Sequence, residues 1–88
     1  MKVLEIRDIV KKDIPLHYRN EYTGTAVVEF PPNHIPEEKK VEFILERSAT
    51  GALDINARFI DRLNYPLLPA LKELKNHIRE LDEKGILY

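Results

Sequence analysis

The chain has 88 residues, with 14 Lys and Arg against 15 Asp and Glu, three His and no Cys. A net charge of −1 excludes a global field that would draw the chain to nucleic acid or to an anionic membrane. The absence of cysteine excludes disulfides, thiol catalysis and thiolate metal sites. No run approaches the roughly 20 apolar residues of a membrane span, so the sequence predicts no membrane contact. We expect one small cytoplasmic domain over residues 1–88.

The first predicted strand covers residues 3–10. Leu4, Ile6 and Val10 fall on one side of the alternation, and Glu5 and Arg7 fall on the other. The alternation therefore places the three aliphatic residues in the core. Residues 11–22 show no clear period and contain a proline, which predicts a connection.

The second predicted strand covers residues 22–30, with Gly24, Ala26, Val28 and Phe30 on one face. The segment PPNHIPEEK at 31–39 follows, with three prolines among nine residues. Proline lacks the amide donor of a sheet ladder, so this segment is expected to be a loop that ends both neighbouring strands.

A β-hairpin is predicted at about residues 40–60. Apolar and polar residues alternate along both of its arms. The apolar face comprises Val41, Phe43 and Leu45 on one arm and Leu53, Ile55, Ala57 and Phe59 on the other. Ser48-Ala49-Thr50-Gly51 supplies the turn, in which Gly51 is expected to take a positive φ. On the opposite face, Glu42 or Glu46 is expected to meet Arg58.

The chain closes with a predicted amphipathic helix that begins between residues 66 and 69. Its apolar stripe comprises Leu67, Leu71, Leu74, Ile78 and Leu81. Gly85 is placed for a left-handed C-terminal cap, with Ile86 folding back onto Leu81. Strands followed by one helix predict an α+β fold: an antiparallel meander of three to four strands with the helix packed on one face (ββββα).

The sequence offers little for catalysis or for cofactor binding. His17, His34 and His77 show no metal-ligand spacing, and the only serine, Ser48, lies in a predicted turn. Three glycines are too few for a phosphate-binding loop or a dinucleotide motif. We therefore expect a non-enzymatic protein without a metal or a cofactor.

Single-stranded nucleic-acid binding on the free sheet face is the alternative function. Its candidate contacts are Lys40, Arg47, Arg58 and Arg62, with Lys39 and the aromatic residues Tyr18 and Tyr22 nearby. The acidic residues Glu29, Glu42, Glu46 and Asp54 share that predicted face and oppose phosphate binding. The order of strands and helix resembles the transcriptional-coactivator type of single-strand-binding domain in topology alone, and no motif of that family is present.

The preferred prediction is a protein-interaction or assembly module that forms a homodimer. Surface scaling predicts roughly 5,400 Å² exposed for this mass and about 64% of the chain surface buried, which is often marginal without disulfides or metals. The candidate interface consists of Ile44, Ile60, Ile86, Leu87 and Tyr88. Alternatively, Ile86 caps the helix and the other residues pack under the segment 11–22.

Overall fold

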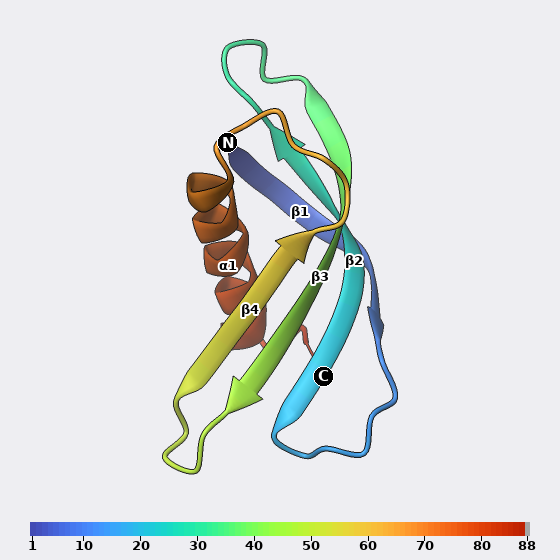
Figure 1. Cartoon of the computed structure of the whole chain (residues 1–88), viewed down its shortest axis with the longest axis vertical. Helices are drawn as coiled ribbons and strands as arrows, with labels where there is room; N and C mark the ends of the chain where they lie inside the picture. The colour runs from blue at the N-terminus through green and yellow to red at the C-terminus, as the bar shows by residue number, and fades with distance from the viewer. Residues whose placement is uncertain (88) are drawn as a thin grey trace.

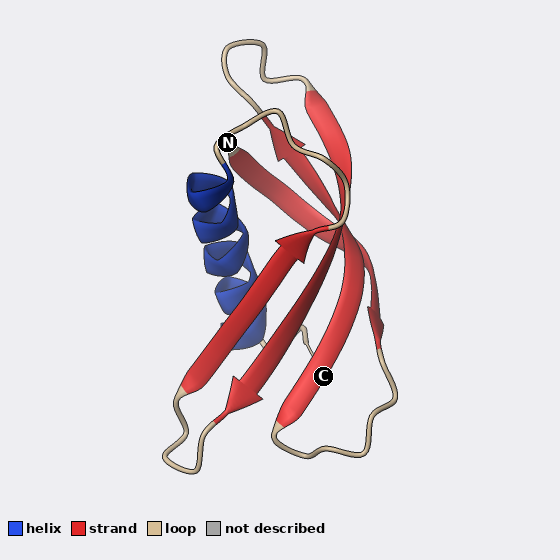
Figure 2. Ribbon diagram, in the orientation of Figure 1, coloured by secondary structure: helices blue, strands red, loops and turns tan. Residues whose placement is uncertain are grey.

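A computed structural model describes residues 1–87 and confirms the predicted ββββα meander. Its elements are β1 (Lys2–Lys11), β2 (Arg19–Glu29), β3 (Pro36–Arg47), β4 (Leu53–Phe59) and α1 (Leu67–Glu83). The four strands lie in the order β1-β2-β3-β4, and each pairs antiparallel with its neighbour in the chain. The helix forms a second layer on one face of this twisted sheet (Figures 1 and 2).

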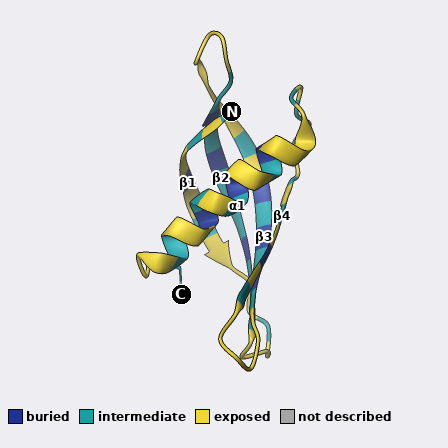
Figure 3. Ribbon diagram, turned by 90° about the vertical axis from the view of Figure 1, so that its left-hand side faces the viewer, coloured by how far each residue is buried: buried dark blue, intermediate teal, exposed yellow. Residues whose placement is uncertain are grey.

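The core lies between the sheet and the helix, where the apolar positions of both layers meet. Figure 3 shows the buried residues gathered on the sheet face beneath α1. The core cluster contains Ile6, Tyr22, Ala26, Val28, Val41, Phe43, Leu45, Ile55, Leu74 and Ile78. Tyr22, where the predicted connection meets the predicted second strand, stacks on Phe43 with ring centroids 5.1 Å apart and is part of the core.

The predicted apolar face of β1 is wrong at two of its three residues. Ile6 is buried, but Leu4 is 38% exposed and Val10 is 60% exposed. The pairing of β1 with β2 shifts between Val3 and Glu5 and again between Arg7 and Val10, which indicates two β-bulges. Each bulge inserts one residue and reverses the facing of those that follow, so a strict alternation fails here.

The hairpin of β2 and β3 is longer than predicted. Pro36 begins β3 opposite Glu29, so the expected loop at 31–39 shrinks to residues 30–35. Proline is tolerated as the first residue of a strand, so Pro36 can begin β3. Likewise, β1 and β2 extend into the predicted connection 11–22 and leave residues 12–18 between them.

The hairpin of β3 and β4 is confirmed in position, facing and turn. Phe43 lies opposite Ala57 and Val41 lies opposite Phe59, so the two apolar faces form one surface. The Ser48 amide donates to the Ala52 carbonyl over 2.9 Å, and Gly51 has a φ of 87°. The left-handed region that this turn requires is therefore filled by glycine, as expected.

The helix begins within the predicted window and ends in the predicted cap. The Ile86 amide donates to the Leu81 carbonyl and the Gly85 amide to the Asp82 carbonyl, each over 3.0 Å, which are the two bonds of a Schellman motif. Its buried face contains Ala70, Leu74 and Ile78. Leu67 was expected in this face but is 55% exposed, because the face begins at Ala70.

The molecule is elongated, with principal extents of 43 × 23 × 22 Å. Its accessible surface of 5991 Å² exceeds the roughly 5,400 Å² expected for a compact domain of this mass. Within residues 1–87, the structure contains no helix with the length and apolar character needed to cross a membrane.

Candidate interaction surface

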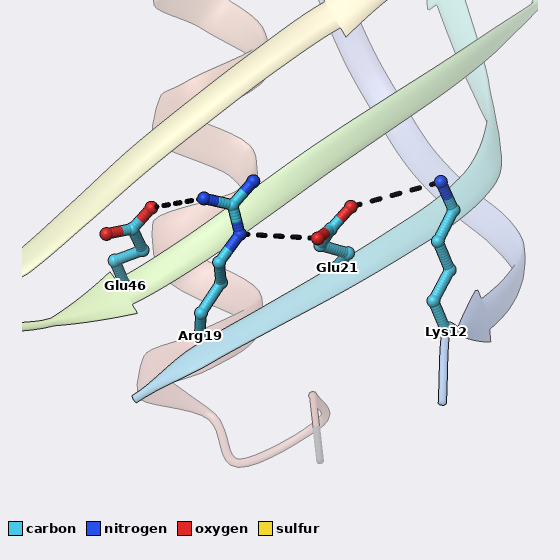
Figure 4. Close-up of polar contacts among 4 residues, drawn as sticks. All are labelled: Lys12, Arg19, Glu21 and Glu46. Carbon is cyan, nitrogen blue, oxygen red and sulfur yellow. Dashed lines mark hydrogen bonds and ion pairs between the residues drawn. The ribbon is translucent and has the colours of Figure 1, made fainter. Parts of the chain in front are cut away.

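The face of the sheet opposite the helix carries alternating polar side chains joined by ion pairs. Arg19 donates to Glu21 over 3.2 Å and to Glu46 over 3.0 Å, and the Lys12 ammonium lies 3.9 Å from Glu21 (Figure 4). Lys12 follows the last residue of β1, Arg19 and Glu21 belong to β2, and Glu46 belongs to β3. The resulting network leaves the charges of this region mutually neutralised, because each cation faces a carboxylate.

Further ion pairs cross the same face, and one of them was expected. Arg58 pairs with Glu42, its neighbour across β3 and β4, which confirms the predicted contact. Arg7 of β1 pairs with Glu38 of β3. The open face therefore presents paired charges rather than a patch of one sign.

The four candidate nucleic-acid contacts do not form a basic patch. Arg47 donates two 2.8 Å hydrogen bonds to Asp82 of the helix, and Arg58 is held by Glu42. Lys40 and Arg62 form no ion pair within residues 1–87, and they lie on β3 and in the linker before the helix. Tyr22 is only 2% exposed, so it presents no ring for base stacking.

A shallow hollow of about 180 Å³ lies at the centre of the open face. Polar and charged residues line its rim, and apolar residues also contribute to the lining: Lys12, Glu21, Glu42, Asn56 and Arg58 with Tyr22, Phe43, Ile44 and Ala57. The four charged residues of this rim already pair with one another, Lys12 with Glu21 and Arg58 with Glu42. The lining of the hollow is more apolar than polar, with paired charges around it.

The candidate interface residues lie in different parts of the fold. Ile44 lies on the open face beside Asn56, and Ile60 is 51% exposed just beyond β4. Ile86 is 51% exposed beyond the helix, whereas Leu87 packs against the core cluster. Tyr88 lies outside the described residues. The tail is thus partly a core element.

The two edges of the sheet differ in regularity, a feature that the sequence interpretation did not use. The edge strand β1 has two bulges, and Asp8 takes a φ of 53° between its paired segments. The other edge strand, β4, pairs with β3 over seven consecutive residues without a bulge. An unbroken edge strand offers its outward amides and carbonyls to another strand, whereas bulges obstruct such pairing.

The position of Asp54 in β4 is a second feature that the sequence interpretation, which placed this acid on the open face, did not use. It lies directly opposite Glu46, and it forms no ion pair within the part of the chain that the structure describes. Like charges in opposed positions destabilise a sheet, so Asp54 is the acid at this edge that a cation would favour. The signal in the sequence is the segment LDINARF at 53–59, in which Asp and Arg are placed symmetrically about Asn56.

The three histidines lie in different segments of the fold: two in loops and one on the helix. His34 lies 3.7 Å from Glu29, at the end of the β2–β3 hairpin. Burial lowers the pKa of His77 on the helix; Glu80 raises it and Lys84 lowers it further, but burial is the larger effect. Within residues 1–87, no group of three or more His, Asp or Glu side chains is arranged to hold a metal ion.

Comparison with known proteins identifies a family. Residues 1–83 match the model of the BB-0187 family, which spans all four strands and the helix. No curated protein and no solved structure matches the chain.

Proposed function

The chain belongs to the BB-0187 family, and we propose that it is a non-enzymatic assembly module that acts through protein contacts as a homodimer. We propose the cytoplasm as its location, as expected from the sequence. The observation that carries the proposal is the amount of apolar surface left exposed on so small a fold. Within residues 1–87, seven large apolar side chains are more than half exposed: Val10, Tyr18, Ile35, Ile60, Leu67, Leu68 and Ile86.

This exposure has an energetic consequence. Burying apolar surface is worth about 25 cal/mol per Å², so each side chain covered by a partner adds to association. Leu68, at 81% exposure, and Ile35, at 64%, lie outside the core cluster of a single copy. The accessible surface of the chain, above that of a compact domain of its mass, supports the same proposal.

Nucleic-acid binding is less well supported than assembly. Phosphate binding gains free energy when protein cations displace the counterions condensed on the nucleic acid. Arg47 and Arg58 are less available for this because they are already paired with carboxylates. A titration with single-stranded oligonucleotides at low and moderate salt tests this alternative. Salt-sensitive binding that is lost in Lys40→Glu or Arg58→Glu would favour it over assembly.

Sedimentation or light scattering over a range of concentrations tests the homodimer. We expect the mass of a dimer at micromolar concentration, weakened by Ile44→Lys or by removal of residues 86–88. Glu73→Lys, an exposed change on the helix, is the control for added charge and should leave the mass unchanged. A monomer that persists at several hundred micromolar would contradict the proposal.

A further inference from the structure

We propose that two copies join through β4, antiparallel to β4 of the partner, with the two-fold axis passing between the Asn56 residues. This pairing would continue one sheet from copy to copy and place both helices on the same face. The inference rests on the proposed homodimer and assigns its surface to the edge strand β4 in place of the tail at residues 86–88. It is argued from the edge geometry of β4, from the symmetry of its side chains and from one unpaired charge. A dimer that is weakened by removal of the tail and not by changes in β4 would favour the tail.

The backbone groups of β4 that point away from β3 can be identified from the ladder. The Ser48 amide bonds to the Ala52 carbonyl and the Ile60 amide bonds to the Lys40 carbonyl, one at each end of the β3–β4 pairing. Hydrogen-bonded pairs alternate along an antiparallel ladder, so Asp54, Asn56 and Arg58 direct their backbone groups toward β3. The amides and carbonyls of Leu53, Ile55, Ala57 and Phe59 therefore face the open edge.

The register centred on Asn56 uses all of these outward groups. It places Leu53 opposite Phe59 of the other copy and Ile55 opposite Ala57 of the other copy, and these are the residues with outward amides and carbonyls. A shift of two residues in either direction leaves the end of the strand unpaired. The central register is therefore the one in which the whole of β4 is paired.

The same register is complementary in charge and in apolar character. On the open face, Asp54 of each copy meets Arg58 of the other, on either side of the Asn56 pair. On the core face, the half-buried side chains of Leu53, Ala57 and Phe59 gain apolar neighbours. Opposite charges and apolar pairs in opposed positions each stabilise an antiparallel ladder.

Asp54 gives the pairing a further advantage. In a single copy it faces Glu46 and has no ion pair within residues 1–87. The neighbouring cation Arg19 is already bonded to Glu46 and Glu21. Arg58 of the second copy, a largely exposed side chain that pairs with its own Glu42, would be shared with Asp54, so association would relieve a repulsion present in the monomer.

Edge β1 does not offer an equivalent surface. Its two bulges and the left-handed Asp8 interrupt the row of outward backbone groups. Natural sheets use such interruptions against edge-to-edge association. The structure thus has one edge that obstructs pairing and one edge that permits it, which selects a closed pair rather than a growing array.

The decisive experiment is disulfide formation in the Asn56→Cys variant. Asn56 would face its own copy across the axis as a non-hydrogen-bonded pair, with Cα atoms about 4.5 Å apart, which is within the range of a disulfide. The chain has no other cysteine, so any disulfide must join two copies. We expect the variant to form a covalent dimer about tenfold faster or more than Thr50→Cys, an exposed position in the turn.

Two further variants test the register itself. In a dimer of Asp54→Cys alone, or of Arg58→Cys alone, the cysteines of the two copies would lie four residues apart along the paired strands. Their Cα atoms would be about 14 Å apart, too far for a disulfide. A mixture of the two variants should form the mixed dimer readily, because residue 54 of one copy faces residue 58 of the other. If each variant linked with itself as fast as the two variants link with each other, the proposed register would be wrong.

The outcomes separate this inference from the proposed function. If the protein has the mass of a dimer and Asn56→Cys links no faster than Thr50→Cys, the β4 pairing is wrong and the homodimer stands. If the protein is monomeric at every concentration and Asn56→Cys links at the rate of Thr50→Cys, both are wrong. A dimeric mass with rapid linking at residue 56 and in the mixture supports both.

Discussion

The side chains on the two faces of the sheet are held by different interactions: apolar packing on one face and ion pairs on the other. On the face beneath the helix, Ala26, Val28 and Val41 are fully buried, and the side chains interlock with Leu74 and Ile78. On the opposite face, Arg19 and its carboxylate partners remain partly exposed. Burial is worth several times more than a solvent-exposed ion pair. Stability is thus concentrated on the face beneath the helix.

The largest effect is expected at the centre of the buried face. Leu74→Ala should lower the free energy of unfolding by about 2–5 kcal/mol, because it leaves a cavity under the helix. Leu68→Ala is the matched control on the same helix, at a position 81% exposed, and should cost less than about 0.5 kcal/mol. Denaturant titration measures both, and similar losses would show that the helix is packed by another face.

The next largest effect is expected in the turn that sets the register between β3 and β4. Gly51 has a φ of 87° and has open space where a Cβ would lie, so the cost of a side chain is one of backbone conformation. Gly51→Val should destabilise by about 1–3 kcal/mol, clearly more than Ala52→Val beside it. The ratio of the two losses in denaturant titration checks this, and equal losses would place the strain elsewhere.

A smaller and asymmetric effect is expected on the open face. Arg19→Gln removes the cation between Glu21 and Glu46 and should cost about 0.5–1 kcal/mol, less in high salt. Glu46→Gln loses the same ion pair but also relieves Asp54, so its net effect should lie within about 0.5 kcal/mol of zero. A larger loss for Glu46→Gln than for Arg19→Gln would contradict the repulsion at Asp54.

The smallest effect concerns pH. Burial lowers the pKa of His77 below its usual 6.5, so below pH 6.5 the unfolded chain binds more protons at this residue than the folded chain does. Stability should therefore decrease as the pH falls from 6.5 through the folded pKa. In His77→Gln this part of the slope should disappear, as measured by denaturant midpoints between pH 7.5 and pH 5. An unchanged slope would assign the pH dependence to other groups.

Regular periodicity was enough to predict the hairpin of β3 and β4 and the limits of the helix. In these segments, core-facing apolar residues recur at every second position of the strands and at every third or fourth position of the helix. Gly51 and Gly85 mark the turn and the cap. The failures lie where the backbone departs from regularity. The bulges of β1 reverse the facing of Leu4 and Val10, and nothing in their residue types announces the extra residues.

The surface was less predictable than the core. The pairing of Arg47 with Asp82 joins residues 35 positions apart, and only the docking of the helix brings them together. The contrast between the two sheet edges also depends on strand order and bulges, which alternation does not report. By contrast, the pairing of Glu42 with Arg58 followed from the hairpin register, because that contact is local.

The meander order also bears on how the chain finds its fold. Every strand pairs with its neighbour in sequence, so each hairpin closes only a short loop of five to seven residues. Loop closure costs conformational entropy that grows with length, and proteins rich in local contacts fold faster than those that need distant pairings. The contact between α1 and β1 is the exception, because it joins the two ends of the chain. We therefore expect the hairpins to form early and the docking of the helix against β1 to complete folding.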